Sequence, residues 1–389
     1  PPWNQNATVP TTLWHSLSDT SSKYRKPLQG LMAPGALALH HPAAPLLQTY
    51  ATTGCPVAID DQWTLDQLEE VIAYGSHPSA QDPTAAKACR DEALEKVSQG
   101  FCQIVPWTAL KADFLAGKCP NLKLSPIAAI PHKSRLFRMI LDLSAKAKRR
   151  RKNPPPAVNE STDPNAAPLH AMAELGKVIP RFIQTIASAP EEDGPILFAK
   201  LDIKDGFWRL CVPPQDAHHF CYPLPKLSPD EPTQIVVPPA LQMGWVSSPP
   251  FFCAATETGR DIAEWLRLFP TLPPHEFEHF MLPKSQVKLF HGLLAPQDWP
   301  VDQLPDFGRR LCYLLEVYMD DYCALLQSLD PAIITHHSRA LLHAIHQIFP
   351  KDPSGKPELD PISYKKLVKQ LEGVWDTRKE ILGWVMDGI

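Results

Sequence analysis

The sequence predicts an α+β fold, in which short strands, hairpins and helices alternate irregularly along 389 residues. Hydrophobic residues make up 44% and charged residues 21%, the balance expected of a globular chain with a substantial core. Apolar stretches of strand length flank polar tips, which favours antiparallel hairpins over repeating β–α–β units. The 44 prolines, about twice the usual share, predict stiff connections and interrupted helices.

The first half is predicted to be largely helical, after a loosely ordered, proline-rich extension at 1–60. Two strands, at 124–130 and 136–143, flank the polar tip His132–Arg135 and predict a hairpin. The segment 153–168 is predicted to be a loop. Helices are predicted at 64–74, 83–99, 106–115 and 169–188. Thr64 is expected to cap the first, and Gly100 to end the second.

The second half is predicted to be richer in strands, with a proline-rich, irregular insertion at about 269–305. Long helices are expected at 250–268 and 332–349. Strands are expected at 196–203, 207–212, 219–223, 234–237, 311–319, 322–326 and 380–386.

Charge is unevenly distributed along the chain. The formal net charge is −4, which by itself does not indicate a nucleic-acid-binding protein. Residues 111–152, however, hold twelve Lys and Arg against only Asp113 and Asp142. A basic stripe on an acidic background predicts a polyanionic partner at one face.

The cysteines and the apolar stretches indicate an intracellular protein, in the cytoplasm or nucleus, that is neither secreted nor bound to a membrane. There are nine cysteines and no C-x-x-C spacing, so buried free thiols in a reducing compartment are expected. No stretch approaches 18 consecutive apolar residues, and no signal-peptide pattern is present. The first residue is Pro1, so we expect the chain to be a piece of a longer polypeptide.

Three aspartates are the strongest candidates for chemistry. Asp202 ends an apolar strand, and Asp320-Asp321 lies at a turn between two apolar strands. Adjacent carboxylates repel each other, which is readily explained if a hard cation such as Mg²⁺ binds there. Two such ions can activate an attacking hydroxyl and stabilise a leaving oxygen at phosphorus. Taken singly, each motif is better read as a strand end or a polar turn.

Together, these motifs resemble those of the reverse transcriptases of retroelements, in the family's order. LDIKDGF at 201–207 and YMDD at 318–321 flank a segment, LQMGWVSSPPFF at 241–252, that is similar to the family's L-x-x-G-W-x-x-S-P-x-x-F. Residues 130–142 resemble the fingers hairpin, and Leu382-Gly383-Trp384 resembles the primer-grip hairpin. The resemblance covers about residues 100–389 and is closest to long-terminal-repeat or related retrotransposons.

The resemblance implies a right-hand polymerase, with fingers and N-terminal helices at 61–195 and a palm at 196–389. The palm would hold an antiparallel sheet packed on helices and end in a primer-grip strand, with the thumb largely absent. The implied activity is RNA-directed DNA polymerisation, in which a primer 3′-OH attacks a dNTP. Implied partners are an RNA template and a DNA or RNA primer. A ribonuclease H, integrase or recombinase is expected elsewhere in a longer polyprotein.

The resemblance also assigns the functional residues one by one. Two Mg²⁺ ions, with Mn²⁺ as an alternative, would be held by Asp202, Asp320, Asp321 and the backbone carbonyl of Ile203. The dNTP would be bound by Lys133, Arg138, Asp205, Gly206, Phe207, Met243 and Gly244. Template and primer would contact Trp245, Ser248, Pro249, Tyr318, Met319, Leu382, Gly383 and Trp384.

Two of these residues bear on which polymerase this is. Phe207 stands where the family places an aromatic gate against a ribose 2′-OH, which argues against an RNA-templated RNA polymerase. Met243 stands where retroviral members have Gln, and a thioether cannot make the hydrogen bonds of an amide. An alternative reading is a decayed or domesticated fragment that binds nucleic acid without polymerising it. The three aspartates, Lys133 and Arg138 argue against that reading.

Two further motifs can be explained without a catalytic role. HEFEH at 275–279 matches the zinc-binding H-E-x-x-H, but prolines on both sides leave little room for a helix, so a metalloprotease site is not expected. KAKRRRK at 146–152 fits a nuclear localisation signal, a template-contacting strip or a solvated loop. Its position beside the hairpin favours template contact.

Overall fold

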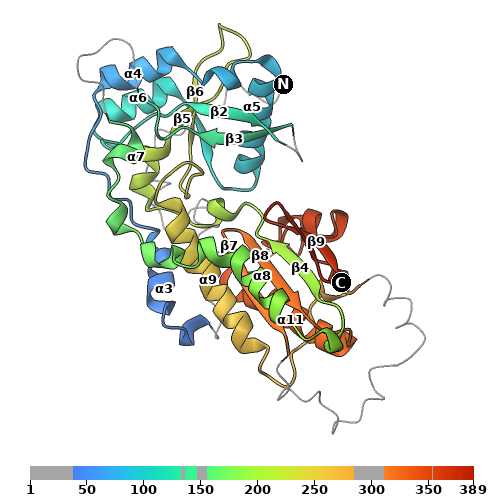
Figure 1. Cartoon of the computed structure of the whole chain (residues 1–389). Coiled ribbons are helices and arrows are strands. Elements are labelled where there is room, and N and C mark those ends of the chain that lie inside the picture. Colours follow the sequence, from blue (N-terminus) through green and yellow to red (C-terminus); the bar gives the residue numbers. More distant parts are fainter. Residues whose placement is uncertain (1–37, 133–135, 147–155, 284–310, 353) are drawn as a thin grey trace. The chain divides into compact units, whose positions relative to one another are not determined.

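The computed structural model of the chain describes residues 38–132, 136–146, 156–283, 311–352 and 354–389 (Figure 1). Within these residues the fold is α+β, as predicted, with four small antiparallel sheets packed on helices. The chain divides into two compact units. The described parts of 49–167 and 207–248 form what we call the hairpin unit. Those of 38–48, 168–206 and 249–389 form the carboxylate unit.

The hairpin unit contains two sheets. One has the strand order β1-β6-β5, and the other is the β2–β3 hairpin. Their bounds are β1 (Gln103–Pro106), β2 (Ile127–Pro131), β3 (Phe137–Leu141), β5 (Tyr222–Pro223) and β6 (Gln234–Val237). The helices are α4 (Leu65–Tyr74), α5 (Pro83–Ser98), α6 (Trp107–Leu115) and α7 (Val158–Ser161), with 3₁₀ turns η3 (Pro78–Ala80), η4 (Pro164–Ala166) and η9 (Pro214–Phe220).

The helix starts in this unit follow from capping residues. The Thr64 hydroxyl accepts from the Gln67 amide, and the Gln67 side chain accepts from the Thr64 amide in return, which makes a capping box for α4. The Asp82 carboxylate caps α5, and Pro83 fills its first position. The predicted helices at 64–74 and 83–99 are therefore confirmed.

The carboxylate unit is built on a three-stranded antiparallel sheet of order β4-β8-β7, with a separate β9–β10 hairpin. The strands are β4 (Leu197–Asp202), β7 (Tyr313–Tyr318), β8 (Asp321–Leu326), β9 (Arg378–Ile381) and β10 (Trp384–Asp387). The helices are α8 (Val178–Ser188), α9 (Ser248–Leu266) and α11 (Pro331–Ile348), with a π-helical turn η12 (Lys365–Lys369) and 3₁₀ turns η2 (Ala38–His40), η5 (Leu169–Met172), η6 (Leu175–Lys177), η7 (Glu191–Asp193), η10 (Glu278–Phe280) and η11 (Pro357–Leu359).

Helices cover both faces of the β4-β8-β7 sheet. On one face, Val178 and Phe182 of α8 pack with Phe198, Cys323 and other buried side chains. On the other face, the buried Tyr322 hydroxyl donates to the Thr256 carbonyl of α9 at 2.9 Å. Burial on both faces explains why the strand sequences are almost continuously apolar until they reach the aspartates.

Several predicted elements are wrong or incomplete. Residues 207–212 are not a strand: η8 (Gly206–Arg209) is a 3₁₀ turn, followed only by an isolated bridge at Cys211. The helix predicted at 169–188 begins only at Val178, because η5 and η6 replace its first half. The predicted loop at 153–168 contains α7 and η4. The stretch 219–223 is a strand only at β5.

Both ends of the described chain also differ from expectation. Within the predicted extension 1–60 lies a helix, α3 (Ala44–Thr53), with Leu47 and Tyr50 buried. The single strand predicted at 380–386 is a hairpin, because Leu382 and Gly383 take positive φ angles of 50° and 84° and turn the chain. The described part of the insertion, up to residue 283, contains η10, and the rest lies outside the described residues.

The expectation for the cysteines is confirmed: all nine are free thiols, and all but Cys312 are buried. None of the described helices is both long and apolar enough to cross a lipid bilayer.

Candidate functional site

Strand register brings the two aspartate motifs together at one end of the β4-β8-β7 sheet. Asp202, the last residue of β4, lies directly opposite Asp321, the first residue of β8. β7 and β8 are joined by the two-residue turn Met319-Asp320, in which Met319 takes a φ of 56°. The amide of Ile203 donates to the Asp320 carbonyl at 2.9 Å and ties this turn to the end of β4.

Burial and mutual repulsion make these carboxylates hard to ionise. Asp202 is 7% exposed, and burial, together with the charge of Asp320, raises its pKa to about 7. Burial raises the pKa of Asp321 to about 6, although Lys200 opposes the shift. Oδ1 of Asp321 is buried without a hydrogen bond. This corner of the sheet therefore favours added positive charge.

Two lysines supply positive charge to this corner. Lys366, on the π-helical turn η12, forms an ion pair with Asp202. Burial lowers the pKa of Lys366, but the Asp202 carboxylate more than offsets this, and the net shift is upward. The ammonium of Lys200 lies 2.8 Å from a Glu372 oxygen and 3.8 Å from Asp321 Oδ1. Sequence reasoning missed both lysines.

The donor set agrees in kind with a magnesium site, but the side chains are not arranged as one. Carboxylate and carbonyl oxygens are the ligands that Mg²⁺ prefers, and Asp202, Asp320, Asp321 and the Ile203 carbonyl belong to that class. Among the described residues, no group of three or more His, Cys, Asp and Glu side chains is placed to hold a metal ion. Ion binding at Asp202 would require Lys366 to give up its ion pair.

The chain leaves β4 through a constrained turn that carries two predicted nucleotide-binding residues. Asp205 has a φ of 56°, a conformation uncommon for residues other than glycine. A Cβ on Gly206 would lie 2.7 Å from the ring of Phe252, so a larger residue fits there only if this ring moves. Close packing therefore favours glycine at this position.

The hairpin unit holds the other predicted nucleotide-binding residues. Arg138 on β3 lies opposite Ile130 of β2, and its Nε donates to the Met243 sulfur at 3.2 Å. Gly244 follows with a φ of 109°, and a Cβ there would lie 2.3 Å from the Leu141 carbonyl oxygen. The predicted fingers hairpin and residues 241–248 of the next motif therefore belong to one unit, whereas residues 249–252 belong to the carboxylate unit. Lys133 lies outside the described residues, as do 147–152 of the basic run.

Asn159 fixes the 241–252 segment, and sequence reasoning missed its role. Its side-chain amide donates to the Gly244 carbonyl at 2.8 Å, and its Oδ1 accepts from the Val246 amide at 3.0 Å. An asparagine that bonds both a carbonyl and an amide of one turn locks that turn. The only signal in the sequence was an Asn in a polar loop.

The side chains predicted to contact template and primer differ in exposure. Trp245 is 2% exposed and donates to the Thr162 hydroxyl at 3.0 Å, so it anchors the core and offers little surface to a nucleic acid. Ser248 is also buried, donating to the Gln242 carbonyl. In contrast, Tyr318 is 39% exposed and Trp384, beside the Leu382-Gly383 turn, is 62% exposed. Met319 contacts Cys253, and Pro249 is half-buried in the first turn of α9.

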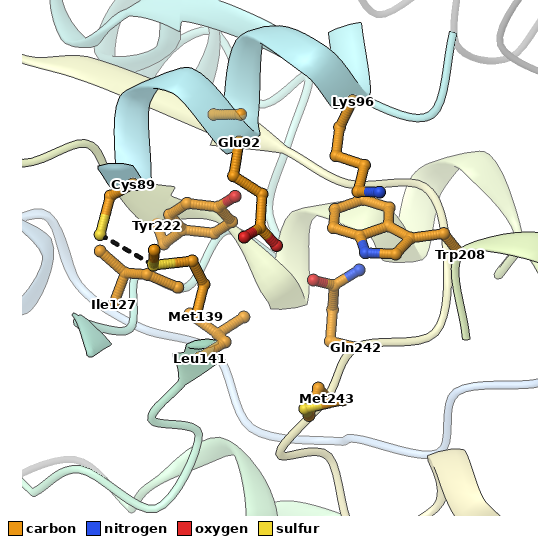
Figure 2. Close-up of a pocket in the computed structure, with 11 residues that line it drawn as sticks. Cys89, Glu92, Lys96, Ile127, Met139, Leu141, Trp208, Tyr222, Gln242 and Met243 are labelled. Carbon is orange, nitrogen blue, oxygen red and sulfur yellow. Dashed lines mark hydrogen bonds between the residues drawn. The ribbon is translucent and has the colours of Figure 1, made fainter. Parts of the chain in front are cut away.

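A small cavity in the hairpin unit lies beside Met243 (Figure 2). Its volume is about 40 Å³, room for a few waters and too little for a nucleobase. Trp208 lines it, lies 6.2 Å from the Phe101 ring, and carries the Lys96 ammonium 6.0 Å from its own ring. Phe207, the residue before Trp208, is half-buried.

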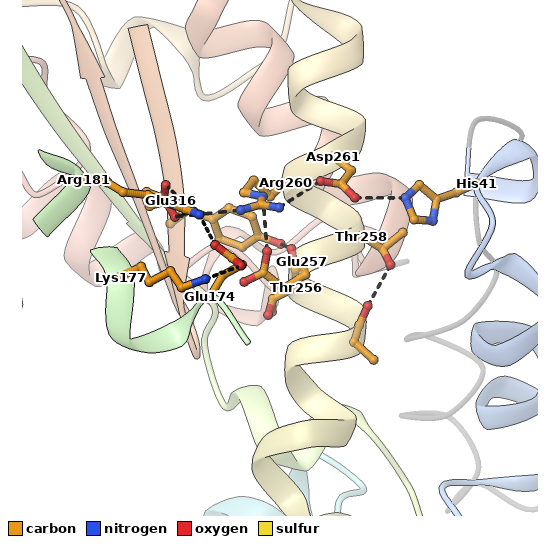
Figure 3. A network of polar contacts seen from close by, with 12 residues as sticks. His41, Glu174, Lys177, Arg181, Thr256, Glu257, Thr258, Arg260, Asp261 and Glu316 are labelled. Atoms are coloured by element: carbon orange, nitrogen blue, oxygen red, sulfur yellow. Dashed lines mark hydrogen bonds and ion pairs between the residues drawn. The ribbon is translucent and has the colours of Figure 1, made fainter. Parts of the chain in front are cut away.

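A network of ion pairs supports the edge strand β7 (Figure 3). Glu316, buried on β7, pairs with Arg181 of α8 at 3.0 Å and with Arg260 of α9 at 3.8 Å. Arg260 also pairs with Asp261, which in turn lies 3.2 Å from His41. The network links both helices to the strand that leads into the Met319-Asp320 turn.

No protein-family model matches this chain, and no curated protein is significantly similar to it.

Proposed function

We propose that this chain is an RNA-directed DNA polymerase, a nucleotidyltransferase that adds dNTPs to a primer 3′-OH. One observation carries the proposal: the register of β4 on β8 sets Asp202 opposite Asp321, with Asp320 in the adjoining turn. Two motifs far apart in the sequence thus supply one buried and two half-buried carboxylates to one end of an antiparallel sheet. Such a set is suited to phosphoryl transfer, where catalysis is mainly positioning and charge stabilisation.

The residues of this chain would then have distinct tasks. Asp202, Asp320, Asp321 and the Ile203 carbonyl would hold Mg²⁺. The bound ions would activate the primer hydroxyl and stabilise the departing pyrophosphate. Arg138 and Lys133 would bind the triphosphate, and the amides of Asp205 and Gly206 would lie near it. Phe207 would exclude a ribose 2′-OH, and the exposed Tyr318 and Trp384 would contact template and primer.

Primer extension on an RNA template with dNTPs and Mg²⁺ tests the proposal. We expect extension by the wild-type chain and a loss of at least about 10³-fold in Asp320→Asn, since a charge is removed where charge develops. The matched control is Asp230→Asn, an exposed aspartate of the hairpin unit. No extension by the wild type with Mg²⁺ or Mn²⁺ would contradict the activity. Extension by Asp320→Asn at the wild-type rate would contradict the site.

The gate has its own test. Phe207→Ala should raise incorporation of ribonucleotides relative to deoxynucleotides by about tenfold or more, because the ring no longer opposes the 2′-OH. Leu227→Ala, a substitution of an exposed apolar residue in the hairpin unit, is the control. If Phe207→Ala incorporates ribonucleotides and deoxynucleotides in the wild-type ratio, the role of Phe207 as a gate is contradicted, but the polymerase activity is not.

A second candidate is a nucleic-acid-binding protein that has lost catalysis. The observation that favours it is the ion pair of Lys366 with Asp202, which sets a protein cation where a metal is expected. Binding of a labelled RNA–DNA duplex without extension, unaffected by Asp320→Asn, would support this candidate over the polymerase.

A further inference from the structure

The loop 360–363 is hydrogen-bonded to the chain at the end of β4, on both sides of Ile203. The Ser363 amide donates to the Asp202 carbonyl at 2.9 Å, and the Lys204 amide donates to the Pro361 carbonyl at 2.8 Å. Between these bonds, Ile203 and Ile362 form an isolated antiparallel bridge. The loop thus acts as a short extra strand that fixes the backbone carrying Asp202.

A chain of buried side chains holds this loop in turn. Oδ1 of Asp360, a residue 4% exposed, accepts from the Ile362 amide at 2.8 Å and lies 3.0 Å from His346 Nε2. On the other side of the His346 ring, Nδ1 lies 3.0 Å from His275 Nε2, and the two rings stack with centroids 5.0 Å apart. His346 projects from α11, and His275 is the first histidine of the HEFEH motif. His275 therefore belongs to a relay in the protein interior.

Only one arrangement of protons satisfies these contacts. Nδ1 of His275 accepts from the Phe277 amide at 3.1 Å, so in the neutral ring the proton sits on Nε2 and is donated to His346 Nδ1. His346 must then carry its own proton on Nε2, which it donates to Asp360. A second proton on either ring would face an N–H group. The relay is therefore closed only while both rings are neutral.

The groups around His275 also disfavour its protonation. His343, also on α11, has its ring 4.9 Å from that of His275 and uses its Nε2 on the Pro273 carbonyl. Lys351 lies nearby in an ion pair with Glu276, and Arg339 of α11 pairs with Glu278. Burial first, then His346, Lys351 and His343, lower the pKa of His275 to about 2.

We propose that His275, His346 and Asp360 form a positioning relay that clamps the 360–363 loop onto β4 and releases it when His275 takes up a proton. The role of the relay in catalysis rests on the proposed function, through Asp202. The clamp itself does not, because it is a property of the backbone bonds. Opening exposes the His275 ring, whose ordinary pKa is about 6.5, so protonation at low pH stabilises the open state. Well below that value, opening becomes about tenfold more frequent per pH unit.

Native-state hydrogen exchange, read by mass spectrometry on the full chain, tests the clamp. After correction for intrinsic exchange, protection of the Lys204 and Ser363 amides should fall about fivefold between pH 6.5 and 5.5. Protection of the β2–β3 hairpin, which has no histidine relay, is the internal control. Equal pH dependence in the two regions of the wild-type chain would overturn the proposal without any variant.

Variants separate the relay from general destabilisation. His346→Gln should lower protection at Lys204 and Ser363 at pH 7.5 by about tenfold or more and reduce its pH dependence. His336→Gln, earlier on the same helix and bonded to the Arg267 carbonyl, should do neither. Asp360→Asn, which keeps an acceptor for Ile362, should retain most of the protection that Asp360→Ala loses. Wild-type protection in both His346→Gln and Asp360→Ala would overturn the relay.

Primer extension then tells whether the clamp matters for activity. If the proposed function holds, His346→Gln should lower kcat with little change in the KM for dNTP, and should flatten the acid limb of the pH profile. Altered exchange with no polymerase activity in any variant would leave the clamp intact and contradict only the proposed function. Altered hydrogen exchange together with a wild-type kcat would contradict the role of the relay in positioning Asp202.

Discussion

The two units each present an antiparallel hairpin with predicted functional residues, and the two hairpins are anchored very differently. The β7–β8 hairpin of the carboxylate unit is extended by β4 into a three-stranded sheet buried between helices. The β2–β3 hairpin has only two strands, and the strand residues Ile130, Pro131 and 137–140 are half-buried or exposed. Two-stranded hairpins are only marginally stable alone. The register of β4 on β8 fixes the carboxylates, whereas the position of the basic β2–β3 hairpin depends on its contacts with neighbouring turns.

The strongest test of this contrast is the turn that packs against β3. Gly244→Ala should destabilise the hairpin unit by about 3 kcal/mol, since the new Cβ meets the Leu141 carbonyl and φ is 109°. Urea unfolding with exchange of β2–β3 amides measures it. Gly117→Ala is the control, because Gly117 has a φ of 72° but open space around its Cβ position. If the two variants behave alike, close packing at Gly244 does not anchor the hairpin.

In the carboxylate unit the largest effect should depend on pH. The pKa of Asp321 is raised to about 6, so the folded chain binds this proton more tightly than the unfolded chain. That stability is present below about pH 4 and is lost as pH rises through 6. Asp321→Asn should therefore be more stable than wild type by about 1–2 kcal/mol at pH 8, without divalent cations, and no more stable near pH 4.

Thermal unfolding across pH 4–8 measures this difference, with Asp230→Asn as the control. Added Mg²⁺ should raise the wild-type Tm at pH 8 more than that of Asp321→Asn, because bound cation relieves the repulsion. A variant that is less stable than wild type at pH 8 would show that the bond to Lys200 outweighs the burial of Asp321.

Arg138 tests the function of the less anchored hairpin. Arg138→Ala should raise the KM for dNTP about tenfold, a free-energy change of about 1.4 kcal/mol, because a charge-assisted contact with phosphate is lost. Its effect on folding should be smaller, since the side chain is only half-buried. Steady-state primer extension measures it, with the exposed Lys226→Ala as the control. An unchanged KM would contradict the proposed role of this hairpin in nucleotide binding.

The smallest effect is expected from a surface ion pair. Lys87 and Asp91 of α5 pair at i and i+4, with side chains 67% and 59% exposed. Lys87→Ala should cost about 0.3 kcal/mol or less, because water and salt screen such pairs. Urea unfolding at low and high salt measures it. A loss above 1 kcal/mol would mean that surface charges contribute to the hairpin unit as buried ones do in the carboxylate unit.

Local sequence patterns predicted the parts of the fold that depend on neighbours along the chain. Capping at Thr64 predicted where α4 begins, because the capping bonds lie within one helical turn. The apolar runs on either side of Asp320 predicted β7, the turn and β8. The same approach failed at 207–212, where an apolar run packs as a 3₁₀ turn, since hydrophobicity alone does not distinguish a strand from a buried turn.

Such local patterns did not predict contacts between residues that are distant in the sequence. Lys366 pairs with Asp202 across 164 positions, and nothing around Lys366 marks it as part of the site. Trp245 belongs to a motif that predicts contact with nucleic acid, yet its side chain fills the core beside Phe220, at a ring distance of 4.9 Å. The HEFEH motif suggested a metal site, and His275 instead completes a relay with His346 and Asp360.

The sequence by itself determined which residues carry charge, where the strands end in aspartates, and that a turn containing Asp320 joins two apolar strands; only the structure placed Met319 in that turn and Asp321 in β8. Those properties are local, since they depend on residue type and on spacing of two or three positions. Only the tertiary structure decided that Asp202 faces Asp321, that Lys366 neutralises it, and that the 360–363 loop fixes its backbone. These follow from strand register and long-range packing, which are set by the whole core.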